Sequence, residues 1–390
     1  MRYSPAAPRP EQGHLRAKNG ALECRQYLTD RTRLQKTSRA ACYFGDAEPE
    51  QGNAEMIRHL AVVGATGAVG REVCAILEER GLRVERLSLL ASSRSAGTKI
   101  SVNGHTLTVR ELSEHSFEGA DYAIFSAGGE RSKHFAPIAT KTGTVVIDNS
   151  SAFRMDPDTP LVVPEINPDD VKKHRGLIAN PNCSTIIMAM AVWPLHRVNQ
   201  VRRIVVSTYQ SASGAGAAAM EELRTQTADH LAGRKVVPRV FPHPIAFNLF
   251  SHNTPIGPDG YNLEEKKMIE ETRKIFHAPS IAIAPTCIRV PVLRAHSESI
   301  NLTFERPITP QEVRSILSEA PGVIVVDDVE ANRFPMPVDA SGQDFVLVGR
   351  IRQDVSQSDG CGIELFASGD QLRKGAALNA IQILELLEKI

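Results

Sequence analysis

Cys183 is the residue of this chain whose surroundings best suit a chemical reaction. It follows Asn182, a good helix-capping residue, and precedes the apolar run Ile186–Met190, so a buried helix is predicted over 184–196. In the first turn of such a helix, unpaired backbone N–H groups and the helix dipole favour a thiolate and any oxyanion that it forms. The sequence therefore predicts a nucleophilic cysteine with a lowered pKa. The alternative is a small core residue, which a cysteine beside an apolar helix often is.

A second chemical motif is a glycine triplet between a predicted strand, 58–63, and a predicted helix, 68–80. Glycines at such a turn let the pyrophosphate of a dinucleotide approach the backbone and rest on the helix N-terminus. The spacing G-x-x-G-x-x-G differs from the commoner G-x-G-x-x-G, but its place at a first βα junction favours dinucleotide binding over a plain turn. The predicted cofactor contacts are Gly64, Thr66, Gly67, Ala68, Val69 and Gly70.

The residues after the second predicted strand, 84–90, indicate which dinucleotide binds. An NAD site usually has a carboxylate there for the ribose hydroxyls. This chain has Ser92, Arg94 and Ser95 instead. A guanidinium flanked by hydroxyls suits a 2′-phosphate, so NADP is the predicted cofactor. The alternative is a solvated loop that happens to contain one arginine.

The elements that must position these residues alternate between short apolar strands and helices, which predicts an α/β fold with a parallel, Rossmann-type sheet. Further strands of this sheet are expected at 121–126, 144–148 and 177–179, with a helix at 131–141. A mixed α+β domain is predicted to follow, with strands at 201–209, 289–293, 299–305 and 345–352 and helices at 216–231, 262–276 and 310–319. The amphipathic segment 372–390 is expected to pack on the first domain.

These patterns divide the chain into three parts. We expect an NADP domain at 56–184, completed by 360–390, and a substrate-binding and dimerisation domain at 185–359. Residues 1–55 are rich in Arg and Ser without sustained periodicity. They could be a transit peptide, but their acidic residues and the lack of a clear amphipathic helix favour a disordered tail or a non-native extension with the working start at Met56.

Composition narrows the function further. The 45 basic and 45 acidic residues balance, which gives no reason to expect a nucleic acid or a membrane surface as partner. Six widely spaced cysteines without a C-x-x-C pair predict neither a metal site nor a disulfide framework, and they suit the cytoplasm. No apolar run reaches the length of a membrane span.

Four motifs together resemble aspartate-semialdehyde dehydrogenases, over essentially everything from Ile57 onward. They are Gly64–Gly70, Asn180–Thr185, Tyr209–Gly216 and Ile288–His296. The resemblance implies a homodimer or homotetramer that reversibly reduces L-aspartyl 4-phosphate to L-aspartate 4-semialdehyde with NADPH, through a cysteine thioester. This reaction serves lysine, threonine, methionine and diaminopimelate biosynthesis.

The resemblance also assigns roles to single residues. Cys183 matches the nucleophile, His296 the acid/base residue, and Gln210 the residue that orients the acyl carbonyl. Arg289 matches the clamp for the substrate carboxylate, and Glu264 matches the contact to the amino group. The remaining carried-over positions are the phosphate ligands Arg154 and Lys267, Asn182 beside the substrate, and Ser213, Gly214 and Gln371 near the nicotinamide.

Three alternatives remain open. Glu264 and Lys267 could be an i, i+3 ion pair on a solvated helix face. The related N-acetyl-γ-glutamyl-phosphate reductases share fold and mechanism, but their cysteine usually lies in Gly-Cys-Tyr-Pro, which differs from Asn180–Thr185. The chain could also be a non-catalytic paralogue, although it keeps Cys183, Gln210, Arg289 and His296 together.

Overall fold

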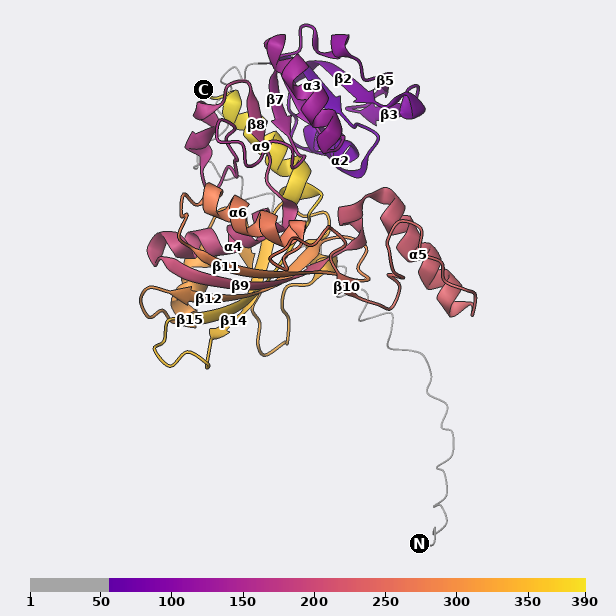
Figure 1. Cartoon of the computed structure of the whole chain (residues 1–390). Helices are drawn as coiled ribbons and strands as arrows, with labels where there is room; N and C mark the ends of the chain where they lie inside the picture. Colours follow the sequence, from indigo (N-terminus) through magenta and orange to yellow (C-terminus); the bar gives the residue numbers. More distant parts are fainter. Residues whose placement is uncertain (1–55) are drawn as a thin grey trace. The chain divides into compact units, whose positions relative to one another are not determined.

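Two large sheets and one hairpin organise residues 56–390, the part of the chain that this computed structural model describes (Figure 1). The prediction for residues 1–55 lies outside the described residues. The first sheet is parallel in every pairing, with the order β5-β2-β1-β6-β7-β8. Its strands are β1 (Ile57–Val63), β2 (Val84–Ala91), β5 (Arg110–Glu111), β6 (Tyr122–Phe125), β7 (Val145–Asp148) and β8 (Leu177–Ala179).

Helices cross over between these strands as the alternating pattern predicts. The helices are α2 (Ala68–Glu79) and α3 (Gly129–Lys141), and the hairpin consists of β3 (Lys99–Val102) and β4 (His105–Thr108). Short 3-10 turns occur at η1 (Ser93–Ser95), η2 (Glu114–Phe117) and η3 (Pro168–Lys173). The strands of a parallel sheet are buried on both faces, and β1 accordingly has six buried residues out of seven.

The second sheet is mixed, with the order β10-β11-β9-β12-β15-β14-β13. Two of its pairings, β11 with β9 and β13 with β14, are parallel, and the others are antiparallel. Its strands are β9 (Val201–Gln210), β10 (Phe250–Ser251), β11 (Ala282–Arg289), β12 (His296–Phe304), β13 (Val323–Val325), β14 (Val346–Gln353) and β15 (Gly362–Gly369). Its helices are α5 (Ala217–Leu231), α6 (Leu263–Ile275), α7 (Pro310–Ser318) and α8 (Pro337–Ala340), with the turn η4 (Ala212–Ala215).

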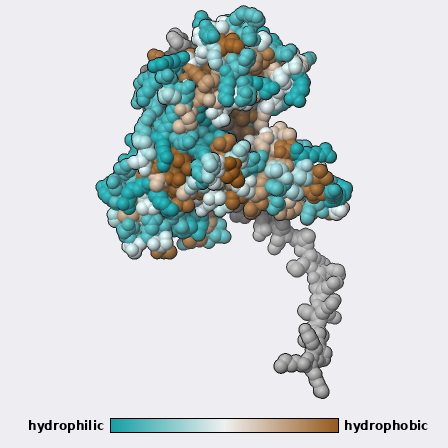
Figure 2. All heavy atoms as spheres, viewed as in Figure 1, coloured by the Kyte–Doolittle hydropathy of each residue, from teal (hydrophilic) through white to brown (hydrophobic). Residues whose placement is uncertain are grey.

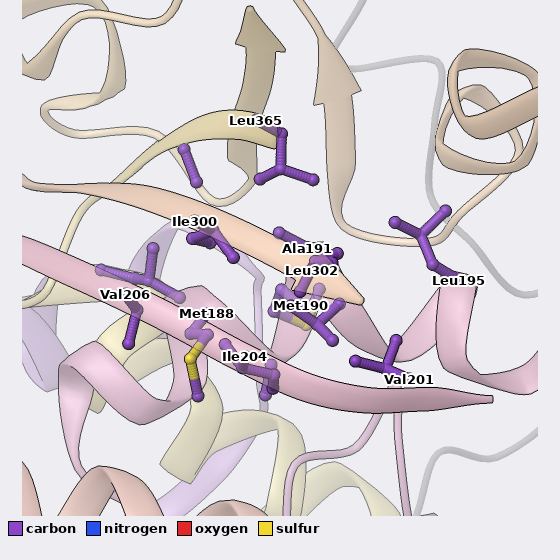
Figure 3. Close-up of a cluster of buried hydrophobic side chains, with 14 of the residues drawn as sticks. Met188, Met190, Ala191, Leu195, Val201, Ile204, Val206, Ile300, Leu302 and Leu365 are labelled. Carbon is purple, nitrogen blue, oxygen red and sulfur yellow. The ribbon is translucent and has the colours of Figure 1, made fainter. Parts of the chain in front are cut away.

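Helix α4 (Cys183–Val198) is the core of this second half. Its apolar residues surround the helix axis, which is typical of a fully buried helix. Figure 3 shows Met188, Met190 and Leu195 of α4 among apolar side chains of β9, β12 and β15. Burial of each such side chain contributes about 1.5–3 kcal/mol, so the start of α4 rests on a rigid base.

The C-terminal segment joins the first sheet, as its amphipathic pattern predicts. After the π-helical turn η5 (Arg373–Ala377), α9 (Leu378–Leu387) packs in one apolar cluster with β1 and α2. Arg373 reinforces this packing with ion pairs to Glu72 and Glu79 of α2, at 3.1 and 2.5 Å. The predicted range 360–390 is too wide, however, because β15 lies inside the second sheet.

Four strands of the second sheet differ from the sequence prediction: β11 was misplaced, and β10, β13 and β15 were not predicted. The strand predicted at 289–293 is wrong, because β11 ends at Arg289. Pro285 lies within β11, and its missing N–H is tolerated because β10 pairs only with residues 288 and 289 and leaves the rest of β11 at the edge. The strand β15 was not predicted, although Ile363, Leu365 and Ala367 alternate with residues of the opposite face.

The surface of the described residues is mixed. In Figure 2, hydrophobic residues form several separate groups among hydrophilic ones on the face shown. No helix among residues 56–390 combines the length and the apolar composition that a membrane crossing requires.

Candidate active site

Cys183 is the first residue of helix α4, at the position that its neighbours predict. The Asn182 side chain caps the helix by accepting hydrogen bonds from the backbone N–H groups of Ser184 and Thr185, at 3.0 and 3.2 Å. The Cys183 side chain is half-buried. On the side of η5, a Cβ atom added to Gly375 would lie 2.9 Å from the Cys183 Cβ. The glycine thus lets the C-terminal segment pass directly over the thiol.

The expected lowering of the Cys183 pKa is wrong for this arrangement. Burial raises the pKa of the thiol to about 12, and the nearby carboxylate of Glu264 adds to this effect. Arg154, Lys267 and Arg289 act in the opposite direction but do not outweigh burial. Local helix geometry favours the thiolate, whereas the surrounding protein removes the water that would stabilise it. Cys183 is therefore a protonated thiol that needs a base.

Helix α6 places Glu264 and Lys267 on the side of the site opposite α4. Lys267 Nζ and Glu264 Oε2 form an ion pair of 3.0 Å, so the i, i+3 pair exists. Glu264 is buried rather than solvated, however, and it accepts a 2.9 Å hydrogen bond from Asn182 Nδ2. Burial alone would raise the pKa of Glu264, but Lys267, His252 and Asn182 together lower it to about 2. The site thus contains a permanently ionised carboxylate close to the cysteine.

Gln210 lies at the end of β9 and is fully buried beneath these groups. Its Nε2 donates to Ser184 Oγ at 3.0 Å and to Glu264 Oε1 at 3.4 Å. Gln210 therefore links the start of α4 to α6. The structure brings together the predicted residues Cys183, Asn182, Gln210, Glu264 and Lys267 from three separate segments.

Arg154 is buried below the turn that precedes Cys183, and it pairs with a residue that the sequence did not suggest. Its NH1 lies 3.0 Å from Glu271 Oε1, and its Nε and NH2 donate to the carbonyl oxygens of Asn180 and Asn149. The second oxygen of Glu271 accepts the backbone N–H of Asn182 at 2.6 Å. In this conformation Arg154 stabilises the turn that precedes Cys183. Some of its guanidinium N–H groups already donate hydrogen bonds to protein acceptors.

Arg289, at the end of β11, is almost fully buried and points into the same site. Its NH1 donates to the carbonyl oxygen of Ser211 at 2.9 Å, while its Nε has no hydrogen-bond partner within the described residues. Burial lowers its pKa and the charges of Glu264 and Cys183 raise it, so the three groups interact. An unpaired, buried guanidinium N–H is suited to an anionic ligand.

His296 begins β12 and is completely buried. Its Nδ1 accepts the backbone N–H of Ser211 at 3.1 Å, whereas its Nε2 has no partner among the described residues. Burial, assisted by the positive charge of Arg289, lowers the pKa of His296 to about 3. The imidazole is thus neutral at physiological pH, with one nitrogen free for a ligand.

Three further predicted residues lie around His296. A Cβ atom on Gly214 would lie 3.0 Å from both Arg289 NH1 and His296 Cε1, so a side chain at this position would press on both groups. Gln371 accepts the backbone N–H of Ala295 at 2.9 Å and donates through its Nε2 to Ser213 Oγ. Ala295 has a positive φ of 70°, a costly conformation that these contacts help to hold.

The glycine motif forms a close-packed turn between β1 and α2. A Cβ atom on Gly64 would lie 2.4 Å from the Ser126 carbonyl oxygen, and one on Gly70 would lie 2.3 Å from the Gly64 carbonyl oxygen. Helix α2 begins at Ala68, and no side chain caps it. The backbone N–H groups in the first turn of α2, close to Thr66, Gly67 and Val69, are therefore suited to bind a phosphate group. The glycine turn as a whole fits a dinucleotide.

The predicted 2′-phosphate residues lie on η1, directly after β2. Arg94 is exposed, and Ser92 and Ser95 are half-buried on either side of it. Parallel neighbours β1 and β2 end at the same edge of the sheet, so η1 and the glycine turn lie at adjacent strand ends. This placement fits one nucleotide lying across both segments.

Sequence reasoning missed three residues of this site. Glu271 could have been found, because it lies on the same face of α6 as Glu264 and Lys267. Ser211 was part of a quoted motif but received no role. His252 directly follows β10, and its Nε2 lies 2.7 Å from Arg289 NH2. No local signal marked it.

The other described cysteines lack these features. Cys74, Cys287 and Cys361 are buried, and burial raises the pKa of each. A high pKa therefore does not distinguish Cys183, but its helix start and its cationic neighbours do. Within residues 56–390, no group of three or more His, Cys, Asp or Glu side chains is arranged to hold a metal ion.

Comparison with known proteins agrees with this geometry. The family model "Semialdehyde dehydrogenase, NAD binding domain" matches residues 59–174, and "Semialdehyde dehydrogenase, dimerisation domain" matches residues 192–374. An aspartate-semialdehyde dehydrogenase of Synechocystis is 54% identical over 328 residues, which cover 84% of this chain and 96% of the relative. The Bacillus subtilis enzyme is 47% identical over 340 residues, with 85% and 98% covered.

A solved structure agrees as well. Aspartate semialdehyde dehydrogenase II of Vibrio cholerae, described as complexed with ASA, superposes with a TM-score of 0.83 at 45% identity. The match covers 86% of this chain and 99% of that one. The parallel sheet is therefore a nicotinamide-cofactor domain, and the mixed sheet corresponds to a dimerisation domain.

Proposed function

Because the chain belongs to the aspartate-semialdehyde dehydrogenase family, we propose that it reversibly converts L-aspartyl 4-phosphate to L-aspartate 4-semialdehyde and phosphate, with NADPH as reductant. The observation that carries this proposal is the position of Cys183. It lies at a helix start, among three cations and one carboxylate, with a neutral histidine in the same buried site. That combination suits a thiol that must bind an anionic acyl phosphate, attack its acyl carbon and displace phosphate.

In the proposed reaction, the Cys183 sulfur attacks the acyl carbon and phosphate leaves, so that a thioester forms. A base must first remove the thiol proton, because burial keeps the thiol protonated. His296 can accept it at Nε2 once its own proton has moved to Nδ1, which requires Nδ1 to give up the hydrogen bond from the Ser211 backbone N–H and to donate to Ser211 Oγ, 3.0 Å away. NADPH, held at the glycine turn that contains Gly64 and Gly70, would supply the hydride that reduces the thioester. His296 then donates a proton from Nε2 to the oxyanion of the resulting hemithioacetal. When His296 takes the hydroxyl proton back, the carbon–sulfur bond breaks, the semialdehyde leaves, and the Cys183 thiolate is protonated again; the reverse reaction runs through the same steps.

The charged residues are proposed to orient the substrate. Arg289 offers an unpaired Nε–H to the α-carboxylate, and the ionised Glu264 attracts the α-ammonium group. Lys267 and Arg154 provide positive charge for the departing phosphate, and Gln210 and Asn182 hold the acyl end beside Cys183. For Arg154, phosphate binding would use the guanidinium N–H groups that its present partners leave free.

We further propose NADP rather than NAD, from Arg94 and its flanking serines, and a homodimer or homotetramer, from the dimerisation-domain match. A cytoplasmic location stays a prediction. We also propose the domain limits 56–184 and 185–359. The C-terminal segment that packs on the first sheet begins after β15.

The decisive experiment is an assay of phosphate-dependent NADP reduction with L-aspartate semialdehyde. We expect activity in the wild type, none in Cys183→Ala, and nearly normal activity in the control Cys74→Ala. A folded, NADP-binding wild type without activity would refute the proposal, and an active Cys183→Ala variant would refute the nucleophile assignment. Turnover of the semialdehyde of N-acetylglutamate in its place would favour the reductase alternative. That substrate lacks the ammonium group that Glu264 is proposed to bind.

A further inference from the structure

His252 reaches the candidate site from a segment with no recognised motif. The short strand β10 pairs antiparallel with Ile288 and Arg289, and the backbone N–H of His252 then donates to the Cys287 carbonyl oxygen at 2.8 Å. This pairing brings His252 Nε2 to 2.7 Å from Arg289 NH2. The position of His252 relative to Arg289 is thus fixed by backbone hydrogen bonds, those between β10 and β11 and the one between His252 and Cys287.

The direction of this hydrogen bond determines the protonation of His252. A guanidinium has only donors, so Nε2 must accept, and the neutral imidazole carries its proton on Nδ1. Nδ1 lies 3.3 Å from Thr254 Oγ1. Burial and the charge of Arg289 lower the pKa of His252 to about 4, against the opposing effect of Glu264. His252 therefore remains an acceptor throughout the physiological pH range.

This acceptor completes the support of the Arg289 side chain. NH1 is held by the Ser211 carbonyl oxygen, NH2 by His252, and the guanidinium carbon lies 5.6 Å from the centre of the Phe241 ring. Two of the three nitrogens are thus held by protein acceptors, and the buried Nε has no partner among residues 56–390. A guanidinium held in this way presents one defined edge to a ligand.

The same contacts continue to helix α6. Thr254 Oγ1 accepts the backbone N–H of Glu264 at 3.2 Å and lies 3.4 Å from the side chain of Asn262, which caps α6. His252 therefore links the arginine proposed for the α-carboxylate to the helix that carries the carboxylate proposed for the α-ammonium group. We propose that His252 is a positioning residue that sets the direction of Arg289 for recognition of the substrate's amino-acid end. This inference rests on the proposed function.

The test compares His252→Leu, which removes the acceptor at similar volume, with His252→Gln, whose amide oxygen can replace Nε2. Loss of a hydrogen bond to a charged group predicts a ten- to hundredfold rise in KM for aspartate semialdehyde in His252→Leu, about the size of such interactions. We expect kcat and the KM values for phosphate and NADP to change less than about threefold, because the chemical step does not involve His252. His252→Gln should restore most of the affinity. The exposed His243, in the loop before β10, provides the control His243→Gln, which should match the wild type.

Several results would overturn the inference. They are an unchanged KM in His252→Leu, a His252→Gln variant as impaired as His252→Leu, or a parallel loss of all kinetic constants. An inactive wild type would instead contradict the proposed function, so the two failures are distinguishable.

A measurement on the wild type keeps the inference testable if the variants fold poorly. With ¹⁵N-labelled histidine, His252 should show the neutral Nδ1–H form down to about pH 5, since Arg289 and Lys267 oppose its protonation and Glu264 and His296 are its other titratable neighbours. A titration near 6.5 would contradict the arrangement.

Discussion

The backbone N–H of Ser211 donates to Nδ1 of His296 over 3.1 Å. A backbone N–H cannot accept, so the resting imidazole carries its proton on Nε2, the nitrogen without a partner among residues 56–390. The tautomer of this histidine is therefore set by a residue 85 positions away, on the turn after β9. In the resting site His296 is ready to donate a proton rather than to accept one.

Replacement of His296 should remove proton transfer without unfolding the protein. For His296→Ala we expect kcat to fall by roughly a hundred- to ten-thousandfold, the usual contribution of a positioned acid/base group. NADP binding, measured by fluorescence titration, should remain normal. Replacement of the exposed His115 by Gln should leave kcat unchanged. A His296→Ala enzyme with more than a tenth of the wild-type kcat would exclude the acid/base role.

Two glycines of the cofactor turn should respond differently to the same substitution. In Gly70→Ala the new Cβ would lie 2.3 Å from a backbone oxygen, and we expect a loss of about 3 kcal/mol in unfolding free energy, the upper end of overpacking costs. In Gly67→Ala the nearest atom is 3.3 Å away and φ is −74°, so the fold should tolerate the methyl group. Urea unfolding measures the first effect. For Gly67→Ala we expect a raised KM for NADP and no comparable loss of stability. Equal stability of the two variants would contradict the prediction.

Glu298 on β12 should make stability depend on pH. It is fully buried, neither carboxylate oxygen has a hydrogen-bond partner in the described structure, and burial raises its pKa well above the ordinary value of 4.5. Above pH 4.5 the unfolded chain loses this proton and the folded chain keeps it, so the contribution of Glu298 to stability falls as pH rises. We expect Glu298→Gln to gain stability relative to the wild type between pH 5 and pH 8, by up to about 1.4 kcal/mol per pH unit. Denaturant unfolding at both pH values measures this gain, and a difference that does not change with pH would contradict the buried neutral state.

Arg94 should determine the choice of dinucleotide. Its exposed side chain on η1 is proposed to bind the 2′-phosphate of NADP. Arg94→Ala should therefore raise the KM for NADP at least about tenfold, as expected for loss of a charge-assisted contact, and leave the KM for NAD nearly unchanged. The ratio of kcat/KM for the two cofactors measures this effect. An unchanged ratio would show that other residues select the cofactor.

The fold could be predicted largely because its signals are local. The parallel sheet follows from alternation of strands and helices, and the start of α4 follows from Asn182, whose capping bonds involve only the next three residues. Among the strands that were misplaced or missed, β11 and β15 depend on their neighbours in the sheet. Pro285 is tolerated in β11 because its partner β10 is only two residues long.

The sequence by itself determined the nucleophile's place at a helix start, the glycine turn and the family to which the motifs belong. Tertiary structure alone decided the protonation of Cys183, because its pKa depends on burial and on charges from Glu264, Arg154, Lys267 and Arg289, which lie between 29 and 106 positions away. It also decided the pairing of Arg154 with Glu271 and of Arg289 with His252. Capping and turn preferences act between neighbours in the chain, whereas desolvation and Coulomb energy depend on which distant segments the fold brings together.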